Sequence, residues 1–492
     1  MNSDKIPSYV LIVVNDKLNI NLDSPGVEIV TADNYLKNYN TAEYSRAIII
    51  NLCNSYRYQS TGYYVSLLGE ARGQKVFPGI NTILEMKSQA LIRIVTKDLD
   101  KLIQKSLSNV HSEKYVLSIY FGENIAKKYD ALALKIFNLF QAPLLRVDFI
   151  KKDVWRITNI NIISMKDIPE THHEALNDIA QRYFGKKISM KRRKLWKYSM
   201  AILYNADEKT NPSDYVAIKK FIKAGKKYGI SSDIIEKDDY NRIPYYDALF
   251  IRETTAVNHH TYKFAQRAEA EGVVVIDDPG SIMKCTNKVY LNELLAKNKI
   301  MVPKTKIITK KTKSIHEIGL EYPVILKKPD SSFSQGVIKV TDDNEYKIKT
   351  KELLSGSDLI IAQEFIPTEF DWRVGIIGKE ILYVCKYYMA KEHWQIVNWG
   401  VKGKNKMGSH QTVDIKSAPK NVLRAALKSA CLIGDGLYGV DVKEKDGIAY
   451  VIEVNDNPSI DSSVEDRLLK DKLYERIMHH FVKKIELNKK QK

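Results

Sequence analysis

The stretch that decides the fold is residues 439–458, which read GVDVKEKDGIAYVIEVNDNP. Two apolar segments flank the Lys-Asp-Gly turn at 445–447, and this pattern predicts a β-hairpin. Glu453 and Asn455 are two residues apart on the second strand, so their side chains leave the same face. We expect that face to present Asp441, Glu453 and Asn455 together.

These three side chains form a candidate metal site. They offer carboxylate and amide oxygens, with no His or Cys among them, and that chemistry suits Mg²⁺ or Mn²⁺ bound together with phosphate oxygens. The alternative is a solvated hairpin face. The acids lie inside an otherwise apolar segment, and an unpaired buried carboxylate is costly, which favours the metal.

A second motif lies upstream, where residues 322–329 (YPVILKKP) predict a strand that ends in Lys327. A polar loop, SSFSQG at 331–336, follows it. Small polar residues and glycine let backbone N–H groups approach phosphate oxygens, and the lysine adds a point charge. A plain hairpin turn is the alternative. The loop residues that we assign to phosphate binding are Ser332, Ser334 and Gly336.

A third motif is the apolar strand LIIAQEFIP at 359–367. Its last residues, Gln363, Glu364 and Phe365, can offer backbone groups and a carboxylate to an adenine and a ribose, although alone they read as a strand end.

A fourth motif, Asp371-Trp-Arg373, follows at once. The acid could bind a ribose and the arginine an acyl phosphate. The alternative is a plain ion pair between them.

Taken in order, these motifs resemble the ATP-grasp superfamily and, within it, the RimK-like glutamate ligases. Residues 284–305 resemble the family segment that supplies a first nucleotide-binding lysine, here Lys288. The resemblance implies an α/β protein with an N-terminal α/β domain followed by an ATP-grasp fold, in which a pre-ATP βαβ domain precedes two α+β subdomains that clamp ATP. The implied division is an N-terminal domain at 1–185, a basic linker at 186–197, a pre-ATP domain at 198–284 and an ATP-grasp domain at 285–487.

The resemblance also implies an activity, which is ATP- and Mg-dependent ligation of a carboxylate to an amine through an acyl phosphate. Catalysis then rests on positioning and charge neutralisation, with Arg373 as the catalytic residue. We expect the acceptor to be a small molecule or a protein, extended by glutamate or a similar amino acid. The implied ATP contacts are Lys288, Lys327, Ser332, Ser334, Gly336, Gln363, Glu364, Phe365, Asp371 and Asn398.

One segment departs from the family. RimK-like ligases carry an arginine before the asparagine that corresponds to Asn398, and this chain has none at residues 389–397. Lys391 or His393 are candidates to replace it at the substrate. Arg252, at the end of a predicted strand, is a further candidate substrate contact, with a local ion pair as the alternative.

The length, net charge and cysteine content of the chain limit the classes of protein to which it can belong. The chain has 492 residues, a formal net charge of +18 and four scattered cysteines, so a disulfide framework and a thiolate zinc site are not expected. No apolar run is long enough to span a membrane. We expect a cytoplasmic protein without a nucleic-acid partner, and leave self-association as a homo-oligomer open. A nucleotide-regulated binding module for an acidic macromolecule is the alternative function.

The hydrophobic pattern along the chain predicts alternating strands and helices. Residues 144–163 predict a hairpin, Asp278-Pro-Gly280 predicts a turn, and the last residues, ELNKKQK, predict a frayed end. The polar loop Asn51–Gly62 follows a predicted strand and is either a ligand site or only a long loop.

Overall fold

The computed structural model describes residues 10–15, 27–39, 44, 47–86, 99–188, 196–208, 210–330, 336–398 and 408–491. It divides into two compact units, Met1–Trp196 and Lys197–Lys492, which are described separately below. Ser332, Ser334 and most of the expected basic linker, residues 189–195, lie outside the described residues.

The first unit begins with a parallel sheet of four strands: β1 (Val10–Val14), β2 (Val27–Thr31), β3 (Ile48–Asn51) and β4 (Lys75–Phe77). Their spatial order is β2-β1-β3-β4. The sheet carries α1 (Ala32–Asn38), α2 (Thr61–Ala71) and α3 (Ile80–Glu85). β1 is buried along its whole length, because it is a central strand.

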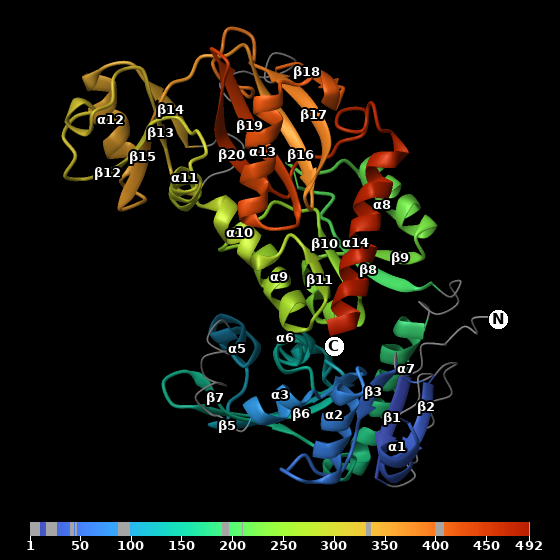
Figure 1. Cartoon of the computed structure of the whole chain (residues 1–492). Coiled ribbons are helices and arrows are strands. Elements are labelled where there is room, and N and C mark those ends of the chain that lie inside the picture. Colours follow the sequence, from blue (N-terminus) through green and yellow to red (C-terminus); the bar gives the residue numbers. More distant parts are fainter. Residues whose placement is uncertain are drawn as a thin grey trace, which may run out of the picture. The chain divides into compact units, whose positions relative to one another are not determined.

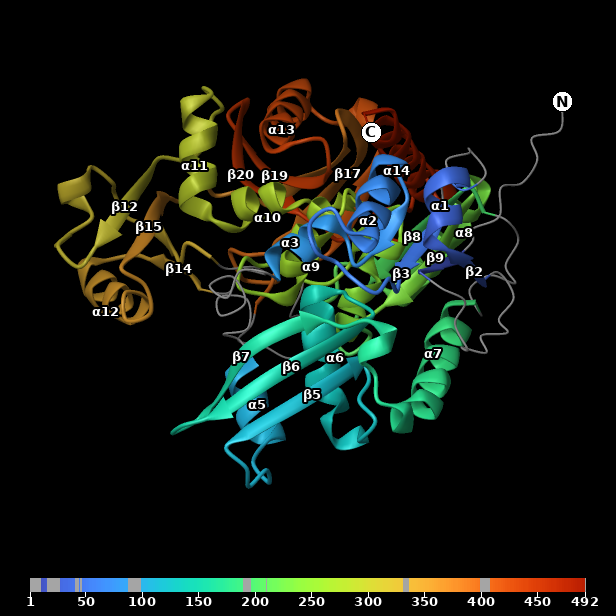
Figure 2. The same cartoon turned by 90° about the horizontal axis from the view of Figure 1, so that it is seen from below.

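A second sheet completes this unit, and it is antiparallel. Its strands are β5 (Lys114–Tyr120), β6 (Leu144–Lys151) and β7 (Trp155–Ile162), so the hairpin predicted at 144–163 is confirmed. Figure 2 shows these three strands as one sheet, with α5 (Asp100–Ser106) and α6 (Asp130–Phe140) beside it. α7 (His173–Ile188) ends the unit and extends past the expected domain end at 185.

The second unit begins with another parallel sheet: β8 (Tyr198–Leu203), β9 (Ile230–Ile235), β10 (Ala248–Ile251) and β11 (Val274–Ile276), in the order β11-β10-β8-β9. α8 (Tyr215–Lys227) and α9 (His260–Ala270) connect its strands. The turn predicted at 278–280 is wrong. Asp278 instead accepts a hydrogen bond from the Ser281 backbone N–H and caps α10 (Pro279–Thr286), with Pro279 in its first turn.

The last helix, α14 (Asp471–Gln491), returns to this sheet and packs beside α8 (Figure 1). Leu473, Tyr474 and Phe481 are fully buried in one core with the sheet. The frayed C-terminal end is therefore a wrong prediction for the described residues, because the helix continues to Gln491. Ile485 is buried, and the Asn488 side chain donates to the Gly272 carbonyl.

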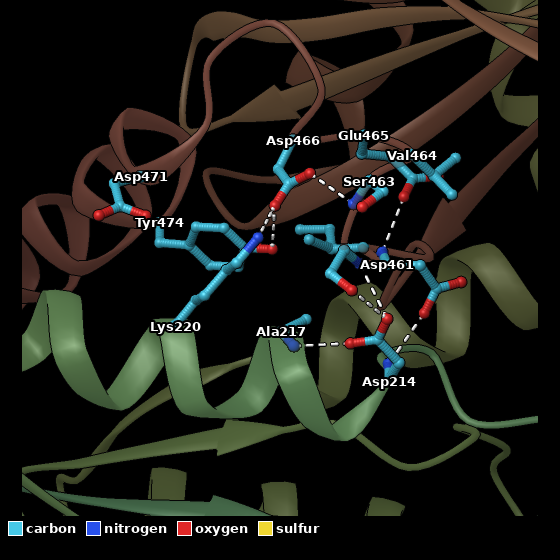
Figure 3. Close-up of polar contacts among 12 residues, drawn as sticks. Asp214, Ala217, Lys220, Asp461, Ser463, Val464, Glu465, Asp466, Asp471 and Tyr474 are labelled. Carbon is cyan, nitrogen blue, oxygen red and sulfur yellow. Dashed lines mark hydrogen bonds and ion pairs between the residues drawn. The ribbon is translucent and has the colours of Figure 1, made fainter.

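Polar contacts tie the loop before α14 to α8, as Figure 3 shows. Asp214 caps α8 by accepting from the Ala217 N–H at 2.6 Å, and its own backbone N–H donates to the Asp461 carboxylate at 2.8 Å. Asp466 accepts from Lys220 of α8 and from Tyr474 of α14. These contacts hold residues 459–470 against the parallel sheet's layer.

Two antiparallel sheets form the rest of the second unit. The first contains β12 (Thr305–Thr309), β13 (Val324–Lys327), β14 (Val337–Val340) and β15 (Leu359–Glu364), in the order β12-β15-β13-β14, with α12 (Asp343–Leu353). α11 (Lys288–Lys297) precedes it, capped by Asn287.

The second antiparallel sheet carries the hairpin predicted first. Its strands are β16 (Phe370–Ile377), β17 (Glu380–Tyr388), β18 (His410–Val413), β19 (Leu437–Lys445) and β20 (Ile448–Asp456), in the order β18-β17-β16-β19-β20. α13 (Lys420–Ile433) covers one face of it (Figure 1). Val440, Val442 and Val454 point to that side and are fully buried.

Short 3-10 turns lie between these elements at Lys127–Tyr129, Met165–Asp167, Glu170–His172, Lys237–Tyr245, His316–Ile318 and Ile415–Ser417. No helix among the described residues is long and apolar enough to cross a membrane.

Candidate functional site

The β19–β20 hairpin brings Asp441, Glu453 and Asn455 together on the face that α13 leaves uncovered. Asp441 pairs directly with Glu453 and Gly439 with Asn455. The Asn455 side-chain amide donates to Asp441 Oδ2 at 3.2 Å. A β-bulge after Asp441 gives β20 one extra residue, so that Val451 faces the core while Glu453 stays on the open face.

Arg373 and Lys288 neutralise these acids. Arg373 makes a two-point contact with Asp441, from Nε to Oδ1 and from Nη2 to Oδ2, both at 2.7 Å. Lys288 Nζ lies 3.1 Å from Glu453 Oε1. Burial raises the pKa of Glu453, but Lys288 and Lys327 outweigh burial and leave it below the usual range. Burial raises the pKa of Asp441, and Arg373 offsets only part of that rise.

Lys327 reaches the site from the facing sheet. It is the last residue of β13, and its Nζ donates to Gln363 Oε1 at 2.7 Å, while the Gln363 amide donates to Thr305 Oγ1 at 2.9 Å. Burial lowers the pKa of Lys327 to about 8. A small pocket between the sheets is lined by Lys288, Lys327, Gln363, Leu295 and Val451, among others.

Lys443 is a member of this face that sequence reasoning missed. Its Nζ lies 2.6 Å from Asp371 Oδ1 and 2.7 Å from Thr368 Oγ1. It follows Asp441 by two residues on one strand, so the period of two could have revealed it. Asp371 is thus ion-paired, although to Lys443 and not to Arg373 as the plain alternative had it.

The residues at the end of β15 and after it differ in burial and in their contacts. Glu364 is half-buried, and its Oε1 accepts from the Lys304 backbone N–H at 2.8 Å. The Phe365 ring lies 4.1 Å from Lys339 Nζ and packs edge-on against Trp394. Asn398 is half-buried at the last described position before residue 399.

The candidate replacements for the missing arginine lie on one loop. Lys391 is exposed, and His393 bonds Gln395 Oε1 at 3.3 Å. Gly336, the described end of the phosphate loop, has a φ of +69°, a conformation that favours glycine.

Arg252 lies away from solvent, fully buried, and is held by five hydrogen bonds. Nη1 donates to Asn457 Oδ1 at 2.6 Å, and Nη2 donates to the carbonyls of Pro212 and Pro458. Nε and Nη2 both donate to Ser213 Oγ. The alternative, a local ion pair, does not occur among the described contacts of this guanidinium, which instead joins β10 to the loop after β20.

The residues fit a divalent cation of the magnesium type. Asp441, Glu453 and Asn455 supply only oxygen ligands from neighbouring positions on one face. Both carboxylates are balanced in this structure by an arginine and a lysine, Arg373 and Lys288, and these residue types commonly bind phosphate in proteins. No cluster of three His, Cys, Asp or Glu ligands occurs in the described part of the chain.

The comparisons with known proteins point the same way. Residues 32–179 match the RimK-like ATPgrasp N-terminal domain, and residues 285–477 match the RimK-like ATP-grasp domain. The chain is 27% identical, over 270 residues, to the alpha-aminoadipate–LysW ligase LysX of Saccharolobus solfataricus, covering 50% of this chain and 90% of that one.

Two further proteins are similar to this chain. The tetrahydromethanopterin:alpha-L-glutamate ligase of Methanocaldococcus jannaschii is 25% identical over 217 residues, covering 42% of this chain and 71% of that one. The crystal structure of a RimK domain ATP-grasp protein from Sphaerobacter thermophilus matches with a TM-score of 0.44 at 18% identity, covering 57% of this chain and 98% of that one.

Proposed function

This chain belongs to the RimK-like ATP-grasp family, and from that premise we propose how its residues carry out ATP-dependent amide-bond formation. It is an ATP-dependent carbon–nitrogen ligase, as the relatives are. The ATP γ-phosphoryl group passes to a substrate carboxylate and gives an acyl phosphate. The amine of a second substrate attacks the acyl carbon, and phosphate leaves.

The observation that carries the assignment of residues is the gathering of acids and cations on one open face. Lys288 and Arg373 pair with Glu453 and Asp441 across 3.1 Å and 2.7 Å, and Lys327 faces them from the other sheet. We assign Lys288 and Lys327 to the ATP phosphates and Arg373 to the charge that develops on the transferred group. No side chain needs to act as a nucleophile.

Asp441, Glu453 and Asn455 would hold Mg²⁺ or Mn²⁺, which supplies charge neutralisation to the phosphate oxygens when bound. Gln363, Glu364, Phe365, Asp371 and Asn398 remain our assignment for the nucleoside side of the site. The serines at 332 and 334 keep the same proposed role at the phosphates.

The substrates are proposed by class. The relatives' names include a protein acceptor, LysW, and a small-molecule acceptor, tetrahydromethanopterin. We propose addition of glutamate or a similar amino acid to an acceptor of one of these two kinds. Lys391 and His393 are proposed as its contacts. We further propose that the enzyme acts in the cytoplasm, since its four cysteines are free thiols.

The first experiment is to trap the acyl phosphate. Purified protein is incubated with Mg²⁺, ATP and pooled carboxylates in the presence of hydroxylamine, and both ADP and hydroxamate are quantified. We expect hydroxamate in proportion to ADP, because hydroxylamine replaces the amine substrate. ADP release without hydroxamate under every pool would overturn the acyl-phosphate route.

Matched variants then test the metal assignment. Asp441→Asn and Glu453→Gln keep side-chain volume but remove charge, and each should reduce hydroxamate formation by at least about a hundredfold. Glu444→Gln is the control, because Glu444 is on the same hairpin but lies near Asn421 of α13. Wild-type activity in both site variants would sink the metal assignment and leave the ligase assignment standing.

A further inference from the structure

The parallel sheet of the first unit has a topological switch point between β1 and β3. β2 lies on one side of β1, and β3 and β4 lie on the other. The connections that leave β1 and β3 therefore run in opposite directions, and the carboxyl ends of these two strands open a crevice. In open parallel sheets, ligands bind in that crevice.

The loop that leaves β3 at this point is held in place by hydrogen bonds and by one close approach of the backbone. Asn51 is fully buried, and its amide donates to the Gly62 carbonyl at 2.7 Å and to Ser66 Oγ at 2.9 Å. Tyr56 Oη donates to the Asn51 carbonyl at 2.7 Å. A Cβ on Gly62 would lie 2.4 Å from the Ser55 carbonyl oxygen, so only glycine permits this approach.

A contact crosses the switch point itself. The Asn54 backbone N–H donates to Asn15 Oδ1 at 2.7 Å, and Asn15 directly follows β1. The loop is thereby anchored to both strands that flank the crevice.

The second sheet supplies the opposite wall of an open cavity of about 300 Å³. Residues 54–57 line it on the loop side, and Asn161 and Asp167 line it from the β7 side. Ile83, Met86 and Ile160 lie buried behind it, and the half-buried Ile162 gives it an accessible apolar part. This volume is at the lower end of the range for small-molecule sites.

Several polar side chains of this cavity are exposed and make no hydrogen bond to the rest of the described protein. Within the described residues, no hydrogen bond or ion pair engages the Arg57 guanidinium or the side-chain amides of Asn54 and Asn161. The Asp167 carboxylate is held by Ser164: its Oδ2 accepts from the Ser164 N–H at 2.8 Å and from Ser164 Oγ at 2.7 Å. Those bonds hold the pKa of Asp167 below its usual range, so it is an anion at neutral pH.

We propose that this crevice is a binding site for a free α-amino acid. Arg57 receives the carboxylate, Asp167 receives the ammonium, and Ile162 contacts the side chain. The cavity has one cation, one anion and an apolar wall, which match the three parts of that ligand. The site is distinct from the ATP-grasp site, because all of its residues belong to the first unit.

Equilibrium dialysis of the full-length protein tests this site. The probe is a mixture of carbon-14-labelled L-amino acids, supplied without ATP, followed by the single amino acid that the protein retains. We expect one equivalent bound by the wild type. Arg57→Ala and Asp167→Asn should each weaken binding by at least about tenfold, because each removes one charged contact.

The controls separate this site from the catalytic one. Arg156→Ala removes an exposed arginine on β7 that does not line the cavity, and it should bind like the wild type. Asp441→Asn alters the ATP-grasp site and should also bind like the wild type. Circular dichroism confirms that each variant is folded. Absence of binding at millimolar probe, or equal binding by wild type and Arg57→Ala, overturns the proposal.

Discussion

Replacing Arg252 by methionine should destabilise the second unit more than any surface change. The hydrogen bonds of Arg252 determine how large the loss in free energy of unfolding should be. The substitution removes five hydrogen bonds and leaves four acceptors without their donor, on Pro212, Ser213, Asn457 and Pro458. An unsatisfied buried acceptor costs about 1–3 kcal/mol. Part of this is offset, because the guanidinium no longer has to be desolvated; burial lowers the pKa of Arg252 to about 10.

The net cost should be about 3–5 kcal/mol, as for other buried charges that lose their partners. With a urea dependence of ~3 kcal/mol per molar, the midpoint should fall by roughly 1–2 M. Circular dichroism gives the midpoint, and hydrogen exchange of peptides from residues 197–491 assigns the change to the second unit. Arg252→Lys should recover part of the loss, since it keeps a charge and three donors.

The matched control is Arg267→Met. Arg267 pairs with Glu271 one turn away on α9, and such a pair contributes only about 0.5 kcal/mol. Equal midpoints for the Arg252 and Arg267 variants would refute the reasoning, because the buried network would then contribute no more than a helix-surface pair.

Three further predictions concern other parts of the second unit. The KM for ATP should rise as pH increases through about 8, where Lys327 loses its proton. Lys327→Arg should flatten this dependence. An unchanged pH dependence of KM in that variant would assign the titration to another group. Phe481→Ala should cost about 3–5 kcal/mol in urea unfolding, whereas Leu487→Ala, on the exposed side of the same helix, should stay within about 0.5 kcal/mol; similar losses would contradict the packing of α14. Lys443→Met leaves the largely buried Asp371 carboxylate without its cation and should both raise the KM for ATP and lower the melting temperature, which calorimetry checks.

The β19–β20 hairpin could be predicted because local patterns define it. A Lys-Asp-Gly turn between two apolar segments specifies the pairing, and the period of two places Asp441, Glu453 and Asn455 on one face. The partners of these acids could not be predicted in the same way. Arg373 is 68 residues from Asp441, and only the pairing of β16 with β19 brings them into register.

The errors have physical causes as well. β9 could not be predicted from the sequence pattern, because it is an edge strand whose middle residues, Ser231–Asp233, are polar and half-exposed. Asp-Pro-Gly at 278–280 serves equally as a turn or as a helix start, and packing of α10 against β20 decides between them. The polar C-terminal residues are helical because α14 docks on the sheet, which propensity alone does not reveal.

The return of α14 to the first sheet of the second unit has a consequence for biosynthesis. Lys223 of α8 and its partner Asp471 are 248 residues apart in the sequence, so the ribosome must add the intervening residues before Asp471 can reach Lys223. At about 5–20 residues per second, the ribosome needs roughly 12–50 s to add it. Throughout that interval β8, β10 and α8 expose the apolar surface that Tyr474 and Phe481 later cover. The nascent chain therefore offers chaperones a defined target until its last helix emerges.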